Sequence, residues 1–387
     1  MKVGYAVLYE NEELVISKNH TILERNIIKN YGEFDDTNVP WKKESRQIKK
    51  IQILDQIKSN CVKEWFLNCT HLTTLINFKN LDVSDCVDFS CMFANCESLQ
   101  DLNELENLNI TNGTDFSSMF YNCTSLQNIN ALQIWNIVNG INFMDMFNHC
   151  HSLQNLNGLQ TWNIVNGINF MDMFIHCHSL QNLNGLQTWN VSNGINFSFM
   201  FADCNSLQNI NALQNWNISN GINFSFMFKS CESLQDLNGL ENWNVSNGTD
   251  FNNMFAYCES LHDLKELQKW NVSNGLDFSS MFAYCISLQN SHGLQNWNIS
   301  NGNKFYNMFK FCYLLQDIKG LEKWNMSNGT DFSFMFKFCE LLQEISLSNT
   351  LYILKKDMFE DCNPKLKIHW KNHIYTYEDL LEYEKIY

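Results

Sequence analysis

Two His-Cys-His tripeptides carry the side chains whose types and spacing best suit metal binding. They are His149-Cys150-His151 and His176-Cys177-His178, placed 27 residues apart, and Asp145 and Asp172 stand four residues before their first histidines. Imidazole and carboxylate groups on neighbouring units of a stack are ligands for Zn²⁺ or Ni²⁺. The two segments are almost identical over their whole length, however, so a recent duplication explains the pairing without any metal.

We therefore expect His149, His151, His176 and His178 to lie on an exposed face, with no metal and no other cofactor bound. Metal binding by these four residues is the weaker alternative. The rest of the sequence has no nucleophile–base arrangement, no glycine-rich phosphate loop and no paired zinc motif. These observations predict that the protein is not an enzyme.

The cysteines form a ladder of equivalent positions instead of pairs. Of 15 cysteines, eleven share one position at intervals of 27 residues, namely Cys69, Cys96, Cys123, Cys150, Cys177, Cys204, Cys231, Cys258, Cys285, Cys312 and Cys339. Stacked equivalents point the same way, whereas a disulfide needs converging Cβ atoms. We expect buried free thiols that act as small apolar side chains. Cys61, Cys86, Cys91 and Cys362 lie off the ladder and are expected to be the more reactive ones.

A second ladder is polar and uncharged over most of its length. It follows a leucine in each unit and includes Gln154, Asn155, Gln181, Asn182, Gln208, Asn209, Gln235 and Asp236. One interpretation is a solvated face that also satisfies stacked backbone groups. The other is an extended binding surface for a partner protein or a host-surface ligand.

These side chains must be positioned by a tandem repeat. Units begin at tryptophans spaced 27 residues apart, from Trp135 to Trp324, and Leu108 and Leu81 continue the register backwards. A fixed period of this length indicates a solenoid or a similar array. Ten full-length units run from Leu81 to Thr350.

Each unit predicts the same local structure. Phe278, Met281, Phe282 and Cys285 have the spacing i, i+3, i+4, i+7, which predicts a short helix with one apolar stripe. Leucines at every third position follow, and the middle one is expected in a short strand. The Asn-Gly pair of each unit predicts a corner, because both residues tolerate positive φ.

The ends of the array need caps, because a terminal repeat exposes an apolar face. Residues 1–64 are expected to form a β-rich N-terminal cap that opens with a hairpin in GYAVLYENEELVIS and includes a strand in RQIKKIQIL. The repeats occupy 65–362. Residues 363–387 are expected to form a C-terminal cap, with a strand in LKIHW and an acidic helix in TYEDLLEYEKIY.

The charge excludes some partners. The net charge is −15, and no lysine or arginine occurs between Leu81 and Phe228. A nucleic-acid-binding surface needs clustered lysine and arginine, so we expect no nucleic-acid partner.

No apolar run reaches the roughly 18–20 residues of a membrane-spanning helix, so no membrane insertion is expected. The start of the chain shows no readable secretory signal, and we expect a monomer.

The repeat resembles that of the BspA-like leucine-rich-repeat surface proteins, including mycoplasma-type lipoproteins. The family repeat runs roughly W-N-T-S-N-V-T-x-M-x-x-M-F-x-x-C-x-x-L-x-x-L, and WNVSNGTDFNNMFAYCESLHDL, starting at Trp243, matches it. The family's valine after Ser-Asn is Gly248 here, and its first methionine is Phe251. The resemblance implies a cell-surface or extracellular protein that adheres to a host or partner, although family members are typically exported and no leader is visible.

The sequence therefore predicts a repeat solenoid of α+β class, a leucine-rich-repeat-like stack of strand–corner–short-helix units with a cap at each end. The function implied by the resemblance is non-enzymatic protein–protein interaction or adhesion through the repeat face. The alternative is an intracellular, cytoplasmic scaffold with no host ligand.

Overall fold

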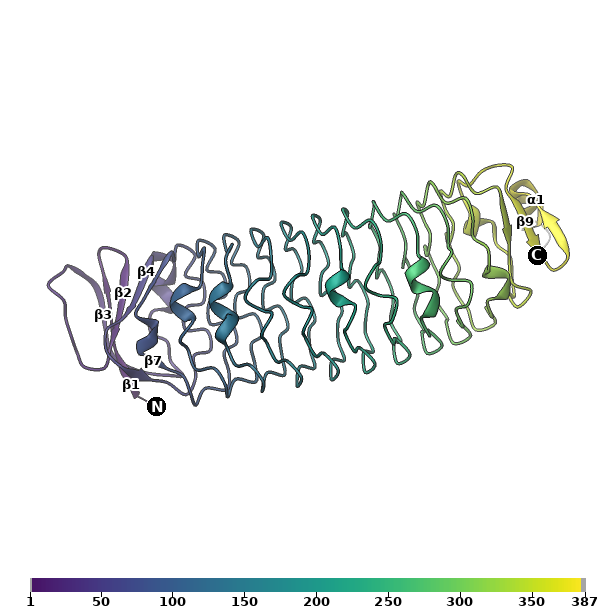
Figure 1. Ribbon diagram of the computed structural model, residues 1–387. Helices are drawn as coiled ribbons and strands as arrows, with labels where there is room; N and C mark the ends of the chain where they lie inside the picture. Colours follow the sequence, from purple (N-terminus) through teal and green to yellow (C-terminus); the bar gives the residue numbers. More distant parts are fainter. Residues whose placement is uncertain (1, 384–387) are drawn as a thin grey trace. The chain divides into compact units, whose positions relative to one another are not determined.

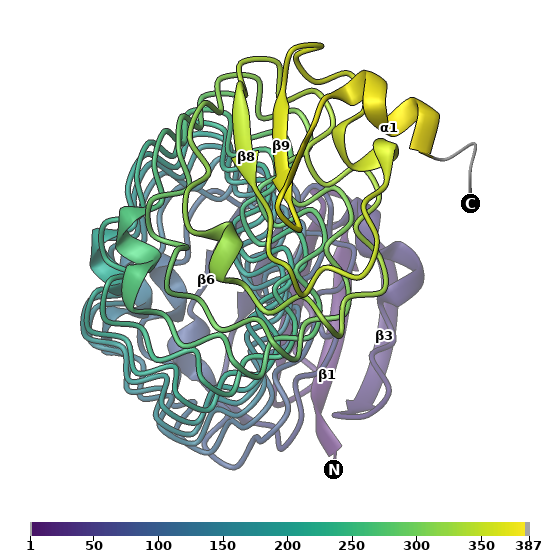
Figure 2. The same cartoon turned by 90° about the vertical axis from the view of Figure 1, so that its right-hand side faces the viewer.

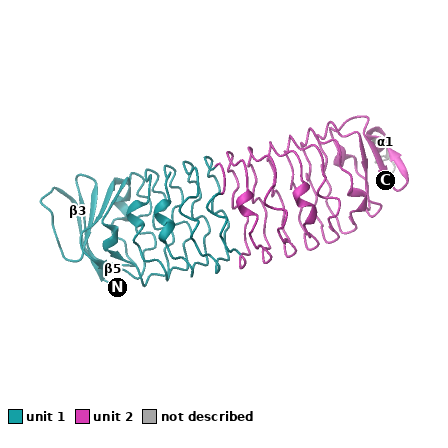
Figure 3. Cartoon of the chain, in the orientation of Figure 1, with its two compact units in different colours: residues 1–180, 184–191 teal, residues 181–183, 192–387 magenta. Residues whose placement is uncertain are grey.

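The computed structural model describes residues 2–383, and the chain divides into two compact units (Figures 1 and 3). Unit 1 comprises residues 1–180 and 184–191, and unit 2 comprises residues 181–183 and 192–387. Each unit contains a stack of coils in parallel register. Asp88 pairs with Asp115 in unit 1, and Asp250 pairs with Asp277 in unit 2, at the 27-residue spacing of the repeat. The predicted leucine-rich-repeat stack is confirmed.

Unit 1 begins with a five-stranded sheet in the order β3-β1-β2-β4-β6. The predicted hairpin is present, because β1 and β2 are antiparallel and Leu8 lies opposite Leu14. The strand predicted in RQIKKIQIL is β4, which alternates exposed and buried side chains and pairs in parallel with β2 and β6. The strands are β1 (Lys2–Tyr9), β2 (Glu13–Ser17), β3 (Ile27–Asp35), β4 (Lys50–Ile53), β5 (Ile57–Lys58), β6 (Thr74–Ile76) and β7 (Leu81–Asp82).

Unit 2 ends with a three-stranded sheet in the order β10-β9-β8, and Figure 2 shows β8 (Glu344–Ser346) beside β9 (Lys367–Trp370). The strand predicted in LKIHW is therefore confirmed. After β10 (His373–Tyr375), the predicted acidic helix is α1 (Tyr377–Tyr383). The remainder of that prediction, residues 384–387, lies outside the described residues.

Between the end sheets, the stacks contain isolated bridges and short 3₁₀ helices. The expected strand around the middle leucine is reduced to single bridges such as Asp101 with Asn128. The 3₁₀ helices are η1 (Lys42–Gln47), η2 (Phe78–Asn80), η3 (Asn103–Leu105) and η4 (Asn130–Ile134) in unit 1, and η5 (Asn211–Leu213), η6 (Lys265–Lys269), η7 (Leu321–Lys323) and η8 (Lys356–Phe359) in unit 2.

The core consists of columns of identical residues held by side-chain bonds from one coil to the preceding coil. In unit 2, the Trp243 indole donates to the carbonyl oxygen of Leu213 at 3.0 Å, and the Cys258 thiol donates to that of Phe228 at 3.2 Å. These tryptophan and cysteine side chains are buried. All fifteen cysteines are free thiols, which confirms the prediction made for the eleven of the ladder.

The predicted short helix is wrong, although its buried stripe is right. Phe278, Met281, Phe282 and Cys285 are fully buried. The backbone between them forms successive tight turns, because Ser280 has φ 56°, and a right-handed helix requires negative φ. The Met281 N–H bonds the Phe278 carbonyl oxygen, three residues earlier, at 3.2 Å.

The intervening amides bond forward to the next coil, as the Phe282 N–H does with the Met308 carbonyl oxygen at 3.0 Å. Turns of this length bury every third or fourth side chain, so the sequence pattern is that of a helix.

The Asn-Gly corner is present for a different reason from the one predicted. The Asn247 side-chain amide donates to the Ser219 carbonyl oxygen of the preceding coil at 2.7 Å, and equivalent asparagines repeat this bond. Gly248 does not have positive φ. A Cβ there would lie 2.5 Å from the Phe251 ring, so glycine is required by close packing.

Candidate functional site

The polar ladder predicted from the sequence lies on the leucine side of the coils. Gln154, Gln181, Gln208 and Gln235 are exposed, and Asn155, Asn182, Asn209 and Asp236 are partly buried. The backbones of these residues hold the coils together, since the Gln208 N–H donates to the Gln181 carbonyl oxygen at 3.0 Å and Asn182 bridges Asn209.

The second residue of each pair contributes to the local turn. Asn155 accepts the N–H of Asn157 on its side-chain oxygen at 3.1 Å, and Asp236 accepts that of Asn238 at 3.0 Å. Only the glutamine amides project freely from the ladder toward solvent. The ladder has the features of the solvated face, and its role in binding stays a prediction.

The structure brings the four histidines together in unit 1, and their rings are stacked. His149 lies on His176 with centroids 4.3 Å apart, and His151 lies on His178 at 4.8 Å. The His149 Nδ1 and His151 Nε2 atoms are 3.1 Å apart. Ring nitrogens that contact one another do not converge on one point. In residues 2–383, no group of three or more histidine, cysteine or acidic side chains is arranged to hold a metal ion.

Asp145 and Asp172 belong to the same cluster and are half-buried. Burial, together with the neighbouring Asp145 carboxylate, raises the pKa of Asp172 to about 6. Burial lowers the pKa of His151, as do the nearby His178 and His149 rings. Asp172 therefore changes charge near pH 6.

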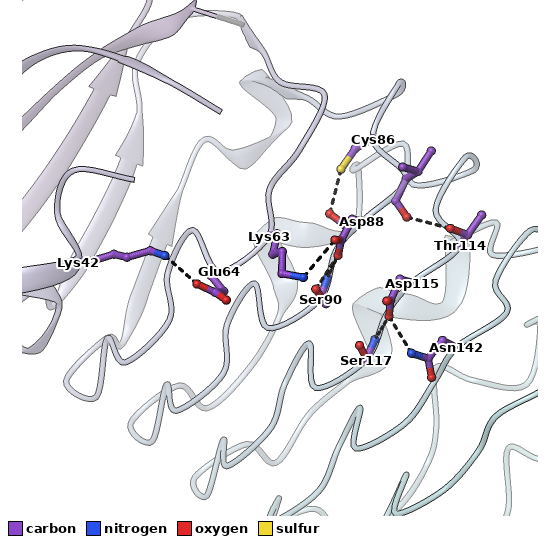
Figure 4. A network of polar contacts seen from close by, with 11 residues as sticks. Lys42, Lys63, Glu64, Cys86, Asp88, Ser90, Thr114, Asp115, Ser117 and Asn142 are labelled. Atoms are coloured by element: carbon purple, nitrogen blue, oxygen red, sulfur yellow. Dashed lines mark hydrogen bonds and ion pairs between the residues drawn. The ribbon is translucent and has the colours of Figure 1, made fainter. Parts of the chain in front are cut away.

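A ladder of acidic and amide side chains lines another edge of unit 1 (Figure 4). Asp88 accepts the Ser90 N–H at 2.9 Å and lies 3.4 Å from the Lys63 ammonium. Asp115 accepts the Asn142 side-chain amide of the next coil at 3.2 Å. These bonds close the turns and join the coils, so this ladder is structural.

Two columns on the turn side of the coils combine positive φ with residue types that change from coil to coil. We call them the turn columns. The first contains Cys91, Ser118, Asp145, Asp172, Phe199, Phe226, Asn253, Ser280, Asn307 and Phe334, and the second contains Asn68, Asn95, Asn122, His149, His176, Asp203, Ser230, Tyr257, Tyr284, Phe311 and Phe338. Every one of these residues has positive φ, between 54° and 64°.

In unit 1, the second turn column begins with an amide ladder. Asn95 donates to Asn68 at 2.8 Å and Asn122 donates to Asn95 at 2.9 Å, each through its side-chain amide. Asparagine suits this backbone because it adopts positive φ more readily than most residues.

In unit 2, the same column becomes a strip of partly exposed aromatic rings, Tyr257, Tyr284, Phe311 and Phe338, which we call the aromatic strip. The rings are stacked, with successive centroids 4.2, 4.4 and 4.4 Å apart. Sequence analysis missed this strip because the aromatic residues fall outside the apolar stripe. The signal that identifies it is the change of residue type within a constant repeat.

Lysines accompany the aromatic strip. The Lys310 ammonium is 5.3 Å from the Phe311 ring centroid, and the Lys337 ammonium is 5.2 Å from that of Phe338. Both distances are typical of cation–π contacts.

The cysteine ladder offers no reactive thiol. Burial raises the pKa of Cys123, Cys177 and Cys258 to about 12, and the thiolate is the nucleophilic form. The expected greater reactivity of the off-ladder cysteines is wrong for Cys86, because it is buried and its pKa is raised to about 12. Cys61 is partly exposed.

No helix within residues 2–383 is both long and apolar enough to cross a membrane.

Comparison with protein families finds matches along most of the chain. The family model described as "Mycoplasma protein of unknown function, DUF285" matches residues 38–157, 141–263 and 259–367. A comparison with curated proteins finds no match.

Among solved structures, a leucine-rich repeat protein from Bacteroides ovatus ATCC 8483 is similar, with a TM-score of 0.47 and 13% identity over 96% of this chain and 98% of that chain. A leucine rich cell surface protein from Faecalibacterium prausnitzii A2-165 has a TM-score of 0.38 and 15% identity over 96% and 94% of the two chains. A leucine-rich repeat protein from Eubacterium ventriosum ATCC 27560 has a TM-score of 0.34 and 11% identity over 96% of each chain.

Proposed function

The chain belongs to the family described as "Mycoplasma protein of unknown function, DUF285", and from this premise we propose that it is a non-enzymatic interaction or adhesion protein displayed at a cell surface. It binds a protein ligand through the turn columns of its repeats. The family match confirms the resemblance to mycoplasma-type repeats that was inferred from the sequence.

One observation carries the proposal, namely a constant framework that presents a variable face. The tryptophan, phenylalanine, cysteine, leucine and asparagine columns repeat almost without change because each of their side chains packs or bonds between coils. The turn columns change from asparagine to histidine and aspartate in unit 1, and hold many aromatic residues in unit 2. A surface that selects one protein partner needs such local differences, whereas an unchanged ladder presents the same groups in every coil.

The chemistry of the side chains also favours binding over catalysis. Most of the cysteine thiols are held in the core, where burial raises the pKa of Cys258 to about 12. Aromatic residues are enriched at the centres of protein–protein interfaces, and the four rings of the aromatic strip are partly exposed.

Brief protease treatment of intact source cells, followed by immunoblotting, tests the surface part of the proposal. We expect the band of this protein to disappear while a cytosolic control protein is spared. A band that stays protected in intact cells, and is degraded only after lysis, would overturn surface display and favour the intracellular scaffold.

A second experiment tests the binding part of the proposal with the purified chain. We expect it to bind a subset of immobilised host-matrix proteins in a saturable manner. Exchanging the turn-column residues of unit 2 for those of unit 1 should change which proteins are bound. Unchanged binding after the exchange would show that another surface is used.

A further inference from the structure

Seven large aromatic side chains occupy backbone positions that disfavour them. In the turn columns of unit 2, Phe199, Phe226, Phe334, Tyr257, Tyr284, Phe311 and Phe338 have φ between 56° and 63°. Left-handed backbone is unfavourable for most residues with a Cβ and is a genuine outlier for bulky ones. An observed outlier of this kind is a reason to look for a function.

The same columns in unit 1 show what the backbone alone selects. There the second column contains Asn68, Asn95 and Asn122, followed by His149 and His176, and the first column contains small or acidic residues. Asparagine, aspartate and histidine are the residues that tolerate positive φ best. The coil geometry is therefore compatible with small polar side chains and does not require aromatic ones.

Burial in the core does not explain the aromatic strip either. The two core phenylalanine columns are complete, with Phe305 and Phe309 fully buried in the coil that carries Phe311. Phe311 itself lies on the outside and is only partly buried. Because its faces are covered by the Tyr284 and Phe338 rings at 4.4 Å, it presents its edge to solvent.

The two coils nearest the end of the strip expose additional apolar surface. Most coils have serine three residues after the second turn column, as at Ser260 and Ser287, but these two have Leu314 and Leu341. Both leucines are 41% exposed. Apolar side chains placed outward at equivalent positions indicate a surface that is covered when a partner binds.

Charge identifies the chemistry of that partner. The Lys310 ammonium lies 5.3 Å from the Phe311 ring centroid and 5.9 Å from that of Phe334. No carboxylate within residues 2–383 forms an ion pair with it. In the next coil, by contrast, the Lys337 ammonium lies 2.8 Å from Glu360 and 3.7 Å from Asp361.

The acidic pair belongs to the last coil and occupies positions equivalent to Lys337 and Phe338, since the Phe338 N–H donates to the Glu360 carbonyl oxygen at 3.0 Å. The protein itself thus shows carboxylates seated beside a lysine of this column. Ring edges carry partial positive charge, so the strip as a whole suits carboxylate oxygens.

We propose that the aromatic strip, together with Lys310, Leu314 and Leu341, binds an acidic polypeptide segment of a partner protein whose carboxylates alternate with apolar side chains. This inference rests on the proposed function and names the chemistry of its ligand. A stacked sugar or nucleic-acid base would need an open ring face, and the strip offers edges.

The probes are a fluorescein-labelled peptide with the sequence Glu-Leu-Glu-Phe repeated three times and its counterpart with lysine in place of glutamate. Fluorescence anisotropy measures the affinity of the full chain for each probe. We expect binding of the acidic probe and about tenfold weaker binding of the lysine probe, because like charges across an interface repel.

Lys310→Glu should reverse this preference. Lys319→Glu is the matched control, because it makes the same charge change in unit 2 beside Asp317, on the leucine side of the coil, and it should leave both affinities unchanged.

Tyr284→Asn combined with Phe311→Asn tests the rings. Because asparagine occupies this column in unit 1, we expect the thermal midpoint of unfolding to be retained while acidic-probe binding is lost. A lowered midpoint with unchanged probe binding would show that the rings only stabilise the stack, and would overturn the proposal.

Three other results would also overturn it. They are equal binding of the two probes by the unmodified chain, binding of a fluorescein-labelled sulfated polysaccharide without binding of the acidic probe, and self-association of the chain that Phe311→Asn abolishes. The protease experiment separates this inference from the proposed function. A displayed protein whose strip variants bind the acidic probe normally refutes only the inference, and a protected protein that binds the probe through the strip refutes only surface display.

Discussion

Replacement of Cys258 tests how the cysteine ladder stabilises the stack. Its side chain is fully buried and its thiol donates to the Phe228 carbonyl oxygen at 3.2 Å. The same oxygen also accepts the Cys231 N–H at 3.2 Å, so it keeps a partner when the thiol is removed. Cys258→Ala therefore loses the packing of one sulfur atom and leaves a small cavity, which costs about 1–2 kcal/mol.

Cys258→Asp should be far more damaging at the same position. A carboxylate there is either ionised in an apolar core or protonated at the cost of a large pKa shift, and each outcome costs several kcal/mol. A loss of about 4 kcal/mol lowers the midpoint of a domain of this size by about 10 °C. Because a coil is stabilised mainly by its neighbours, we expect several coils of unit 2 to unfold together.

Urea unfolding followed by tryptophan fluorescence measures both variants, since buried tryptophans occur throughout the stack. Cys61→Ala, at a partly exposed cysteine off the ladder, is the control and should change the free energy of unfolding by less than about 0.5 kcal/mol. A Cys258→Asp variant with the same urea midpoint as the unmodified chain would refute the assignment of this column to the core.

Three further predictions test other columns. Asp172 has a folded-state pKa of about 6 against an ordinary value of 3.8, so folding favours its protonated form. The contribution of this group to the free energy of unfolding is complete below pH 3.8 and is lost as the pH rises through 6. Asp172→Asn should therefore raise the free energy of unfolding at pH 7.5 by about 1 kcal/mol. The full pKa shift corresponds to roughly 3 kcal/mol, and this is discounted because the side chain is partly exposed. Urea curves at pH 7.5 that show a lower free energy of unfolding for the variant would contradict this sign. Gly248→Ala should cost about 1–3 kcal/mol in the same assay, because the new Cβ would meet the Phe251 ring, and an unchanged midpoint would disprove the close-packing explanation. Gln181→Ala combined with Gln208→Ala should change stability by less than about 0.5 kcal/mol and leave host-protein binding intact, whereas loss of binding in a folded variant would assign binding to the polar ladder.

The periodicity of the sequence was sufficient to predict which side chains are buried. A residue in the core of one coil has an equivalent in the core of the next, so Phe282, Cys285 and their equivalents could be assigned together. The hairpin of β1 and β2 was also predictable from two apolar runs around a polar turn, and β9 from its alternating exposed and buried residues, because these signals are local.

The conformation of the apolar stripe was not predictable from the same pattern. A helix and a series of tight turns both bury residues at i, i+3, i+4 and i+7. What distinguishes them is whether the amide of Phe282 bonds within its own coil or to Met308 in the next one. That choice depends on a neighbour 26 residues away and leaves no mark on the local spacing.

Two expectations stay predictions. They are the cap boundaries at residues 64 and 362 and the binding role of the polar ladder.

The histidines illustrate what the sequence spacing predicts and what only the geometry of the stack decides. Their spacing predicts that His149 and His176 are neighbours, which the structure confirms, but the parallel stacking of their rings at 4.3 Å follows from coils that lie in register.

By itself the sequence determined the repeat, its length, the buried columns and the free thiols, because each depends on residue types that recur with one period. Only the tertiary structure decided that the coils turn with positive φ, that their asparagines and cysteines donate to the preceding coil, and that Tyr284, Phe311 and Phe338 meet in one outward strip with Lys310 beside it. The physical reason is that these features are made between coils, by hydrogen bonds and ring contacts across about one repeat length, and a single repeat contains no information on how its neighbour is placed.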